Sequence, residues 1–262
     1  METLQALSRY YGVYDEDNRL RSRHGMVEYL TTMRYIERYL RPGMRILEIG
    51  AATGRYSHHL AQQGYRVDAV ELIEHNIEIF KHNTKPGESV TITQGNAMDL
   101  SAFESDTYDI TLLLGPMYHL FTREDKLKAL SEAIRVTRKG GIIFAAYCMG
   151  DASVLSYGFI RGEIFNIIEK CMLNTETFDT FSNPWDIFEL HRKEDIDKLR
   201  SEFNVTQLHF VASDGYTNHM RETVDKMDDR MYELYLKYHL AICERQDMIG
   251  YSHHTLDIFR KE

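Results

Sequence analysis

A short apolar strand that runs into a glycine-bounded turn constrains this chain more than any other feature. Residues 46–49 read Ile-Leu-Glu-Ile, and they are followed by a turn bounded by Gly50 and Gly54 and then by a polar-led stretch. An apolar run of this length that ends at a turn before a helix is typical of a buried parallel strand. The two glycines let a ligand approach the backbone, because neither has a Cβ. The sequence therefore predicts a strand–turn–helix unit that contacts a ligand.

The residues in and beside the turn indicate the charge of that ligand. A dinucleotide-binding turn would read Gly-x-Gly-x-x-Gly and would place a pyrophosphate at the helix N-terminus. Here Ala52 stands at the second glycine position and Arg55 at the third, so the pattern fails. Glu48 lies at the carboxyl end of the strand, where its carboxylate would repel a phosphate and attract an ammonium or sulfonium group. A ligand with a cationic amino-acid end therefore fits better than a nicotinamide dinucleotide.

Residues 48–54 (Glu-Ile-Gly-Ala-Ala-Thr-Gly) resemble the first motif of the class I S-adenosylmethionine-dependent methyltransferases of the small-molecule type. The usual pattern of that motif is acidic-x-Gly-x-Gly-x-Gly, and Ala52 replaces the middle glycine. The resemblance extends from about Met44 to Tyr147 and includes a later segment at 135–141, Arg-Val-x-Arg-x-Gly-Gly. It implies S-adenosylmethionine as the cofactor, S-adenosylhomocysteine as the product, and methyl transfer to a small molecule.

The order of apolar patterns predicts an α/β fold, in which strands alternate with amphipathic helices. The resemblance implies a doubly wound, seven-stranded, mostly parallel sheet with helices on both faces, whose last strand runs antiparallel between its neighbours. The expected strands are 46–49, 65–72, 89–94, 108–114, 142–147, 204–212 and 252–260, and the expected helices include 22–40, 55–63, 73–83, 123–138, 153–173, 193–203 and 218–245.

A chain of 262 residues is long enough for one large α/β domain with added segments. We expect a single methyltransferase domain over residues 1–262. Its parts would be a helical N-terminal arm at 1–43, a cofactor-binding core at 44–150, a helical lid insertion at 151–203, and C-terminal strands with a long helix at 204–262.

The resemblance assigns the cofactor to the loops that follow the first, second and third strands and to the loop after the fourth. Glu48 and the glycine turn would hold the methionine end, and Glu71 would accept hydrogen bonds from the ribose diol with its two oxygens. Asn96, with a backbone N–H of Ala97 or Met98, would recognise adenine. The expected cofactor-binding residues are Glu48, Gly50, Ala51, Ala52, Gly54, Glu71, Leu72, Asn96, Ala97, Met98, Leu114 and Gly115.

His119 and Tyr118 are the candidate catalytic residues, because they follow the strand that borders the methyl donor. An imidazole near neutral pKa can take a proton from a substrate. Alternatively, His119 would line the pocket and hydrogen-bond the backbone. Tyr118 suits such a lining role better than a catalytic role. The expected substrate-binding residues are Tyr11, Tyr14, His24 and Trp185, although packing against the helix at 22–40 explains the two tyrosines equally well.

Composition narrows the class of partner. The net charge of −9 lacks the basic excess of a nucleic-acid-binding domain, so a small-molecule acceptor is expected and nucleic acid is not. Cys148, Cys171 and Cys243 have no zinc spacing, and the adjacent His253 and His254 should point to opposite faces of a strand, so no metal site is predicted. No membrane span or amino-terminal signal pattern is present, which predicts a cytoplasmic protein. Monomer and homodimer both stay open.

Three hypotheses for function remain at this stage. The first is methyl transfer from S-adenosylmethionine to an oxygen, nitrogen or sulfur nucleophile, with carbon also open. The second is a non-catalytic S-adenosylmethionine-binding regulatory module. The third is an NAD-linked oxidoreductase, which Glu48 and the missing third glycine oppose. Residues 115–118 read Gly-Pro-Met-Tyr, so the Asn/Asp-Pro-Pro-Tyr loop of DNA-adenine methyltransferases is absent from that place.

Overall fold

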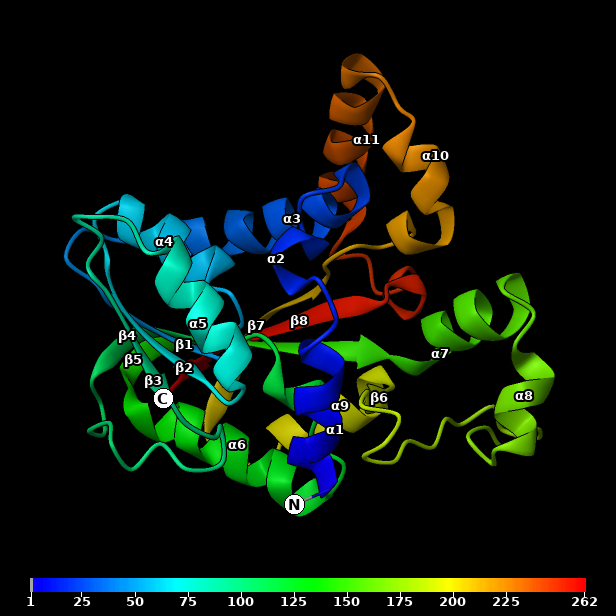
Figure 1. The fold of residues 1–262 in the computed structure, drawn as a ribbon, viewed down its shortest axis with the longest axis horizontal. Coiled ribbons are helices and arrows are strands. Elements are labelled where there is room, and N and C mark those ends of the chain that lie inside the picture. The colour runs from blue at the N-terminus through cyan, green and yellow to red at the C-terminus, as the bar shows by residue number, and fades with distance from the viewer. Residues whose placement is uncertain (1) are drawn as a thin grey trace.

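One twisted β-sheet forms the centre of the computed structural model, which describes residues 2–262 (Figure 1). Its strand order is β3-β2-β1-β4-β5-β8-β7, and the short β6 pairs with β5 off this path. All neighbouring strands are parallel except at β8, which runs antiparallel between β5 and β7. The strands are β1 (Arg45–Ile49), β2 (Arg66–Glu71), β3 (Val90–Gln94), β4 (Tyr108–Leu113), β5 (Thr137–Met149), β6 (Leu190–His191), β7 (Val205–Ala212) and β8 (His254–Lys261).

This sheet confirms the predicted α/β class and the antiparallel last strand. It differs from the prediction by the additional β6, which lies against Cys148 and Met149 at the end of β5. Two residues are too few to show a strand periodicity, so the sequence could not reveal this strand. The prediction also began β5 five residues too late, because Thr137–Gly141 is polar and glycine-rich yet extends the strand.

The helices that cover the sheet and extend from it also follow the sequence closely. Two predicted helices are each broken. The stretch at 153–173 is divided into α7, a π-helical turn at 154–160 and α8, and the stretch at 218–245 is divided at 226–228, where Asp228 caps the N-terminus of α11. The helices are α1 (Glu2–Tyr11), α2 (Glu16–Arg19), α3 (Arg23–Tyr39), α4 (Arg55–Gln62), α5 (Glu74–Asn83), α6 (Arg123–Val136), α7 (Gly150–Ser153), α8 (Ile164–Glu169), α9 (Lys193–Arg200), α10 (Arg221–Asp225) and α11 (Asp229–Ile242).

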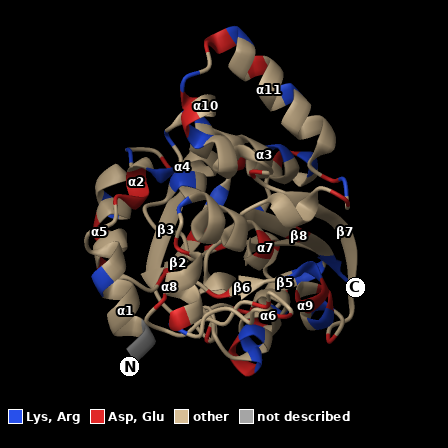
Figure 2. Ribbon diagram, turned by 90° about the vertical axis from the view of Figure 1, so that its right-hand side faces the viewer, with Lys and Arg blue, Asp and Glu red and all other residues tan. Residues whose placement is uncertain are grey.

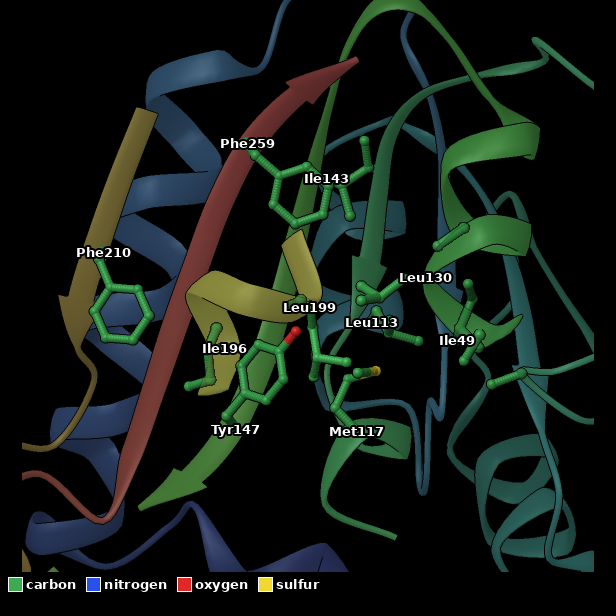
Figure 3. Packing of buried hydrophobic residues seen from close by; sticks show 14 of the residues in the cluster. Ile49, Leu113, Met117, Leu130, Ile143, Tyr147, Ile196, Leu199, Phe210 and Phe259 are labelled. Atoms are coloured by element: carbon green, nitrogen blue, oxygen red, sulfur yellow. The ribbon is translucent and has the colours of Figure 1, made fainter. Parts of the chain in front are cut away.

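Two apolar layers hold the helices to the sheet. On one face, α6 and α9 pack against alternate residues of the central strands, as Figure 3 shows for Leu130, Ile196 and Leu199 against Ile143 and Phe259. On the other face, α3 and α4 cover the residues that point the opposite way along the same strands. This alternation follows from the two-residue period of a strand. The central strands are therefore buried on both faces, as their nearly continuous apolar sequences predict, whereas the edge strand β3 is largely exposed.

The N-terminal arm lies across the carboxyl edge of the sheet. Ala6 and Leu7 of α1 pack with Ile73, which follows β2, and with Ile187 from the segment before β6. The loops after β1, β2 and β4 meet at this same edge, because the three strands are parallel neighbours in register, with Ile49 beside Val70 and Leu113. The arm therefore covers the edge where the cofactor loops converge.

Charged residues of both signs occur along the outer helices. Figure 2 shows Lys and Arg interspersed with Asp and Glu along the outer helices. Within residues 2–262, no helix combines the length and the apolar character needed to span a membrane.

Candidate cofactor and substrate site

A cavity of about 540 Å³ lies at the carboxyl edge of β1, β2 and β4, and Leu4, Leu7 and Tyr11 of α1 form part of its wall. The volume is that of a typical small-molecule site. The loops from three strands and the N-terminal arm all contribute to it. From the predicted residues, the cavity is lined by Glu48, Gly50, Ala51, Ala52, Glu71, Leu72, Asn96, Ala97, Met98, Leu114, Gly115, Tyr118, His119 and Tyr11.

The turn after β1 is held close to the loop after β4. Gly50 has a φ of +77°, and a Cβ at this position would lie 2.7 Å from Pro116 Cδ. A side chain would therefore both strain the backbone and push the two loops apart. Gly54 also has a positive φ, but it packs under His58 and Phe80 and does not line the cavity. Of the two glycines that bound this turn, Gly50 lines the cavity and Gly54 does not.

Glu71 braces the same turn from the neighbouring strand. Its Oε2 accepts a hydrogen bond from Ala52 N–H at 2.9 Å, and its Oε1 accepts one from Ile73 N–H at 2.8 Å. Oε1 also accepts a hydrogen bond from Asn76 Nδ2 at 3.4 Å, so of the roughly four acceptor positions of the carboxylate the open one lies on Oε2. Burial raises the pKa of Glu71, while the backbone donors of Ile73 and Ala52 oppose that rise. The geometry suits an acid that accepts a hydrogen bond from a ligand hydroxyl while it holds the turn.

Glu48 is a nearly buried carboxyl beside the cavity. Only 2% of its surface is exposed, and Ser57 of α4 donates a hydrogen bond to its Oε2. Burial raises the pKa of Glu48 to about 8, although the Ser57 hydrogen bonds lower it in part. The carboxyl is therefore mostly protonated at pH 7. A cationic group placed next to it would favour ionisation, because the opposite charge offsets the loss of water.

The turn after β3 contains an internal hydrogen bond. Asn96 Oδ1 accepts a hydrogen bond from Met98 N–H at 3.0 Å. Of the two backbone donors that the sequence offered for adenine, the one on Met98 is thus already engaged within the turn. Asn96, Ala97 and Met98 all border the cavity. The turn thus lies at the cavity, and its contact with adenine stays a prediction.

Tyr118 and His119 lie in and after a short 3₁₀ turn (Pro116–Tyr118) that follows β4. The Tyr118 hydroxyl donates to Leu114 O at 3.1 Å, and burial raises its pKa well above the ordinary value. Tyr118 therefore stays protonated and fixes its own loop. This geometry agrees with the wall that the sequence favoured for Tyr118.

His119 is held by two hydrogen bonds, one on each ring nitrogen. Its Nδ1 lies 2.7 Å from Ile187 O, and its Nε2 lies 2.9 Å from the Tyr11 hydroxyl. A carbonyl oxygen can only accept, so Nδ1 carries the proton and Nε2 accepts from Tyr11. Burial lowers the pKa of His119 to about 4, against the Ile187 hydrogen bond, which raises it. The Nε2 lone pair that a general base would use is occupied by Tyr11.

Three predicted substrate residues lie outside the cavity lining. Trp185 is 60% exposed and Tyr14 is 38% exposed, while His24 hydrogen-bonds Asp225 through its backbone and ring. From the predicted lid insertion, Pro184 rather than Trp185 reaches the cavity. The aromatic content of the insertion could not show this, because exposed and pocket-lining aromatics have the same composition.

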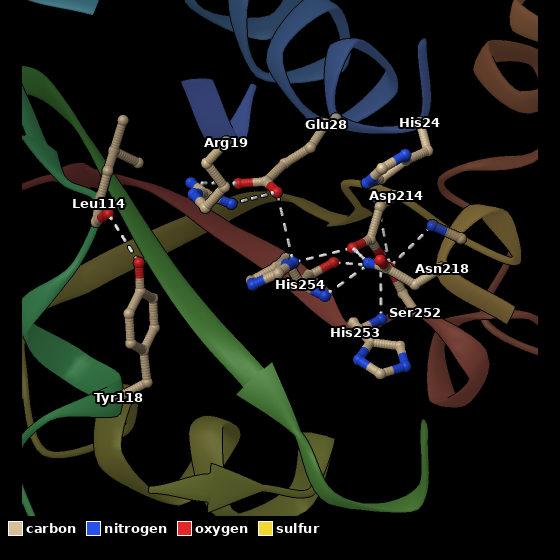
Figure 4. Close-up of polar contacts among 12 residues, drawn as sticks. Arg19, His24, Glu28, Leu114, Tyr118, Asp214, Asn218, Ser252, His253 and His254 are labelled. Carbon is tan, nitrogen blue, oxygen red and sulfur yellow. Dashed lines mark hydrogen bonds and ion pairs between the residues drawn. The ribbon is translucent and has the colours of Figure 1, made fainter. Parts of the chain in front are cut away.

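A charged network that begins in the N-terminal arm could not be predicted from the sequence (Figure 4). Arg19, which lines the cavity, contacts both oxygens of Glu28 at 2.8 and 3.2 Å. His254 Nδ1 lies 3.4 Å from Glu28 and 2.8 Å from Asp214. These residues come from four separate parts of the chain, so no local pattern brings them together.

The same network is the place where a metal ion must be considered. Among the described residues, Glu28, Asp214 and His254 bring one ligand atom each within 4.8 Å of one another. Burial alone would lower the pKa of His254, but Glu28 and Asp214 raise it well above its ordinary value. A protonated imidazole cannot ligate a metal. With Arg19 on both Glu28 oxygens, the cluster is a chain of alternating charges.

The cavity fits the cofactor that the first motif implies. Oε2 of Glu71 has an acceptor position left for a ribose hydroxyl, and the buried Glu48 marks a place where a cation would be stabilised. Gly50, which has no Cβ, lets the turn after β1 lie against the loop after β4.

Comparisons with known proteins agree with this geometry. A family model described as "Methyltransferase domain" matches residues 47–145. A ubiquinone biosynthesis O-methyltransferase from Methylocella silvestris is 34% identical over 128 residues, which are 48% of this chain and 48% of that protein. An S-adenosyl-L-methionine-dependent Diels-Alderase, iccD, from Talaromyces variabilis is 31% identical over 38% of this chain and 34% of its own. The chain thus spans less than half the length of either relative.

A solved structure shares the fold over a larger part of the chain. A SAM-dependent methyltransferase from Methanosarcina mazei superposes with a TM-score of 0.56 at 18% identity, and covers 87% of this chain and 96% of its own. The family model covers the glycine turn and the strands that build the cavity, and the structural likeness extends beyond them. Residues 47–145 therefore match a methyltransferase-domain family, and the chain has the fold of a solved SAM-dependent methyltransferase.

Proposed function

We propose that this protein transfers the methyl group of S-adenosylmethionine to a small-molecule nucleophile. The observation that carries the proposal is the pair of buried carboxyls, Glu48 and Glu71, at the ends of adjacent strands in one cavity. Glu48 is placed to stabilise a cationic group, and Glu71 is placed to accept a hydrogen bond from a diol. S-Adenosylmethionine carries an ammonium, a sulfonium and a ribose diol in one molecule.

Different residues of the cavity would bind the three parts of the cofactor. Glu48 and the Gly50 turn would hold the methionine end, Glu71 the ribose, and the turn at 96–98 the adenine. When bound, the cofactor supplies a methyl group already activated by its positive sulfur. The protein's part is to hold the acceptor in line with that group, to exclude water, and to receive a proton if the acceptor carries one.

The size and cover of the cavity favour a small acceptor. The arm helix α1 lies over the site, and Leu4, Leu7 and Pro184 line it together with the strand loops. A covered space of about 540 Å³ suits a cofactor with a small partner and not a polymer. The acceptor atom is oxygen, nitrogen or sulfur.

Two other functions are outcomes of the same experiments. A regulatory module would bind S-adenosylmethionine without turnover. An NAD-linked oxidoreductase would bind NADH. The Talaromyces relative is by name an S-adenosyl-L-methionine-dependent Diels-Alderase, so the name of a similar protein joins this cofactor to a reaction other than methyl transfer.

Calorimetry with S-adenosylmethionine, followed by incubation with methyl-labelled cofactor and pooled phenol, amine and thiol acceptors, tests the proposal. We expect binding in the micromolar range, release of S-adenosylhomocysteine, and label in one acceptor class. A Glu71→Ala variant serves as the control for background hydrolysis. Binding without label transfer would favour the regulatory module. Absence of binding, together with a rise in NADH fluorescence, would favour the oxidoreductase.

A further inference from the structure

The cavity contains one hydrogen-bonded pair that joins the N-terminal arm to the loop after β4. Tyr11 is the last residue of α1, and His119 lies 108 residues further along the chain. Their rings meet edge to face, with centroids 5.8 Å apart, and both side chains line the cavity. The pair therefore exists only when the arm lies over the site.

The direction of this hydrogen bond is fixed by the third partner. Ile187 O accepts from His119 Nδ1, so Nε2 has a lone pair and Tyr11 must be the donor. The Tyr11 oxygen then keeps both lone pairs. His119 has no such freedom, since each of its nitrogens is engaged. The atom of this pair that can accept a proton from a bound molecule is the Tyr11 oxygen.

We infer that Tyr11 is a catalytic residue that takes the proton of the methyl acceptor, while it passes its own hydroxyl proton to His119 Nε2. This inference rests on the proposed function. His119 acts through Tyr11, so it is a positioning and proton-accepting residue and does not touch the acceptor. The acceptor class that needs such a relay is a protonated nucleophile, such as a hydroxyl or thiol.

The step balances in atoms and charge. A lone pair of the acceptor atom forms the new bond to the methyl carbon, and the electron pair of the broken carbon–sulfur bond stays on sulfur. The acceptor's proton moves to the Tyr11 oxygen as the Tyr11 proton moves to His119 Nε2. One positive charge disappears at sulfur and one appears on the imidazole, so the total charge of the cavity is unchanged.

The surroundings of the pair support a relay rather than a free tyrosinate. Burial raises the pKa of Tyr11 well above its ordinary value, with Tyr118 and Glu16 adding to the rise and Arg19 opposing it. Tyr11 therefore does not ionise near neutral pH, and it can accept a proton only as it gives one away. Glu16 of α2 and Glu71 of β2 are the acids near Tyr11, and Arg19 is the nearby cation.

Nitrogen NMR of the full chain tests the hydrogen-bond direction without any turnover. In protein labelled at histidine, the His119 signals are assigned by their loss in a His119→Gln variant. We expect Nδ1 protonated and Nε2 unprotonated at pH 7. Tyr11→Phe should shift Nε2 toward the value of an unbonded nitrogen and leave the tautomer unchanged. A protonated Nε2 at pH 7 would overturn the relay, since Tyr11 could then only accept.

Kinetics with an acceptor found in the pooled assay tests the chemical role. Tyr11→Phe should lower kcat about 100-fold, the effect of losing a positioned acid–base group, while calorimetric affinity for S-adenosylmethionine stays within about twofold. Tyr10→Phe is the matched control, because Tyr10 stacks on Tyr14 outside the cavity lining. It should keep the wild-type rate.

The pH profile separates the relay from a structural role. Because His119 receives the proton, kcat of the wild-type protein should begin to fall only near pH 4, where His119 becomes protonated. This fall at low pH should be absent in Tyr11→Phe. Wild-type kcat in Tyr11→Phe would overturn the relay and leave the proposed function standing. Failure of the wild-type protein to bind S-adenosylmethionine would instead remove the proposed function.

Discussion

At the scale of single residues, the site depends on two carboxyls in different states. Glu48 and Glu71 are both nearly buried, with 2% and 6% of their surfaces exposed, yet they have different partners. Glu71 accepts two backbone hydrogen bonds, whereas Glu48 faces one hydroxyl. Backbone donors stabilise the ionised form of an acid. We therefore expect the two residues to respond differently to substitution and to pH.

The Glu71→Ala variant should bind S-adenosylmethionine about 10- to 100-fold more weakly, because a ribose hydroxyl loses its charged acceptor, a hydrogen bond worth roughly 1.5–3 kcal/mol. Isothermal calorimetry measures the change. Glu74→Ala is the matched control, since Glu74 is an exposed acid three residues further along, in the first turn of α5. Equal affinities in the two variants would remove the ribose assignment.

Binding of the cofactor should release a proton from Glu48. Its pKa is about 8 in the free protein, and a bound ammonium must lower it. At a pH between the pKa of Glu48 in the free protein and its lower pKa in the complex, Glu48 is protonated in the free protein and ionised in the complex. The affinity for S-adenosylmethionine therefore rises with pH and levels off above about 8. Calorimetry at pH 7 in buffers of different ionisation enthalpy should detect the release. Glu48→Gln should abolish both effects, and proton release that persists in this variant would point to another group.

At the scale of elements, the glycine turn works because it can touch the loop after β4. Gly50 and Gly43 have similar backbone angles, with φ of +77° and +83°, but different surroundings. A Cβ on Gly50 would meet Pro116, while a Cβ on Gly43 would meet no atom of the described chain within 4 Å. The two positions thus separate backbone strain from steric contact.

Gly43→Ala should cost about 1 kcal/mol of stability, the ordinary penalty of a left-handed residue, and leave cofactor affinity unchanged. Gly50→Ala should lose at least twice as much stability and at least tenfold in affinity, because Pro116 must move. Urea denaturation and calorimetry on both variants give the comparison. If Gly50→Ala matched Gly43→Ala in both measurements, the contact between the two loops would have no role.

Much of the element order was predictable, because its signals are local. The apolar runs of β1, β2 and β4 and the glycine turn are short segments whose pattern does not depend on the rest of the chain. The break before α11 was missed although Asp228 and Asp229 could have signalled a helix cap, since the Met-rich stripe on either side continued the same period. Sequence reading also could not show that Trp185 points away from the cavity and Pro184 toward it.

Contacts between distant segments set the limit of that prediction. Tyr11 and His119 were each proposed for the site, but their hydrogen bond, and with it the engaged Nε2, follows only from how α1 crosses the sheet edge. The network of Arg19, Glu28 and Asp214 gave no signal at all. Such contacts depend on tertiary packing, which no local periodicity encodes.

At the scale of the whole molecule, Asp214 connects the ends of β7 and β8. Its Oδ1 accepts from Ser252 Oγ at 2.7 Å and from His253 N–H at 2.9 Å, and its Oδ2 pairs with His254. Burial alone would raise the pKa of Asp214, but the His254 contacts lower it. Each charge therefore depends on the other.

Asp214→Asn should destabilise the protein by up to about 3–5 kcal/mol near pH 6, because it removes the nearer of the two acids that face the charged His254 and leaves Glu28 at 3.4 Å. The lowered pKa of Asp214 means that its contribution is present above the unfolded value of 3.8 and is lost as the pH falls below it. The raised pKa of His254 means that its contribution is full below 6.5 and is lost as the pH rises through the native value. The difference between variant and wild type should therefore be largest between about pH 4 and 6.5.

Denaturant unfolding at several pH values measures that difference. Asp229→Asn is the control, since the Asp229 side chain is 96% exposed in its pair with Arg23, and surface pairs are worth about 1 kcal/mol or less. A loss in Asp214→Asn that did not vary with pH would show that its hydrogen bonds, and not its charge, hold the two strands.

The position of β8 between β5 and β7 also governs how a growing chain can assemble on the ribosome. Within residues 2–262, β7 pairs with β8 alone, although residues 205–212 are synthesised well before residues 254–261. At normal translation speeds the edge of a nascent β7 stays unpaired and prone to aggregation for several seconds. By then β1 to β4 have all their neighbours and can form the ligand-binding edge early, whereas β5 also lacks its partner β8. A chaperone that shields residues 205–212 during this interval would raise the yield of folded protein.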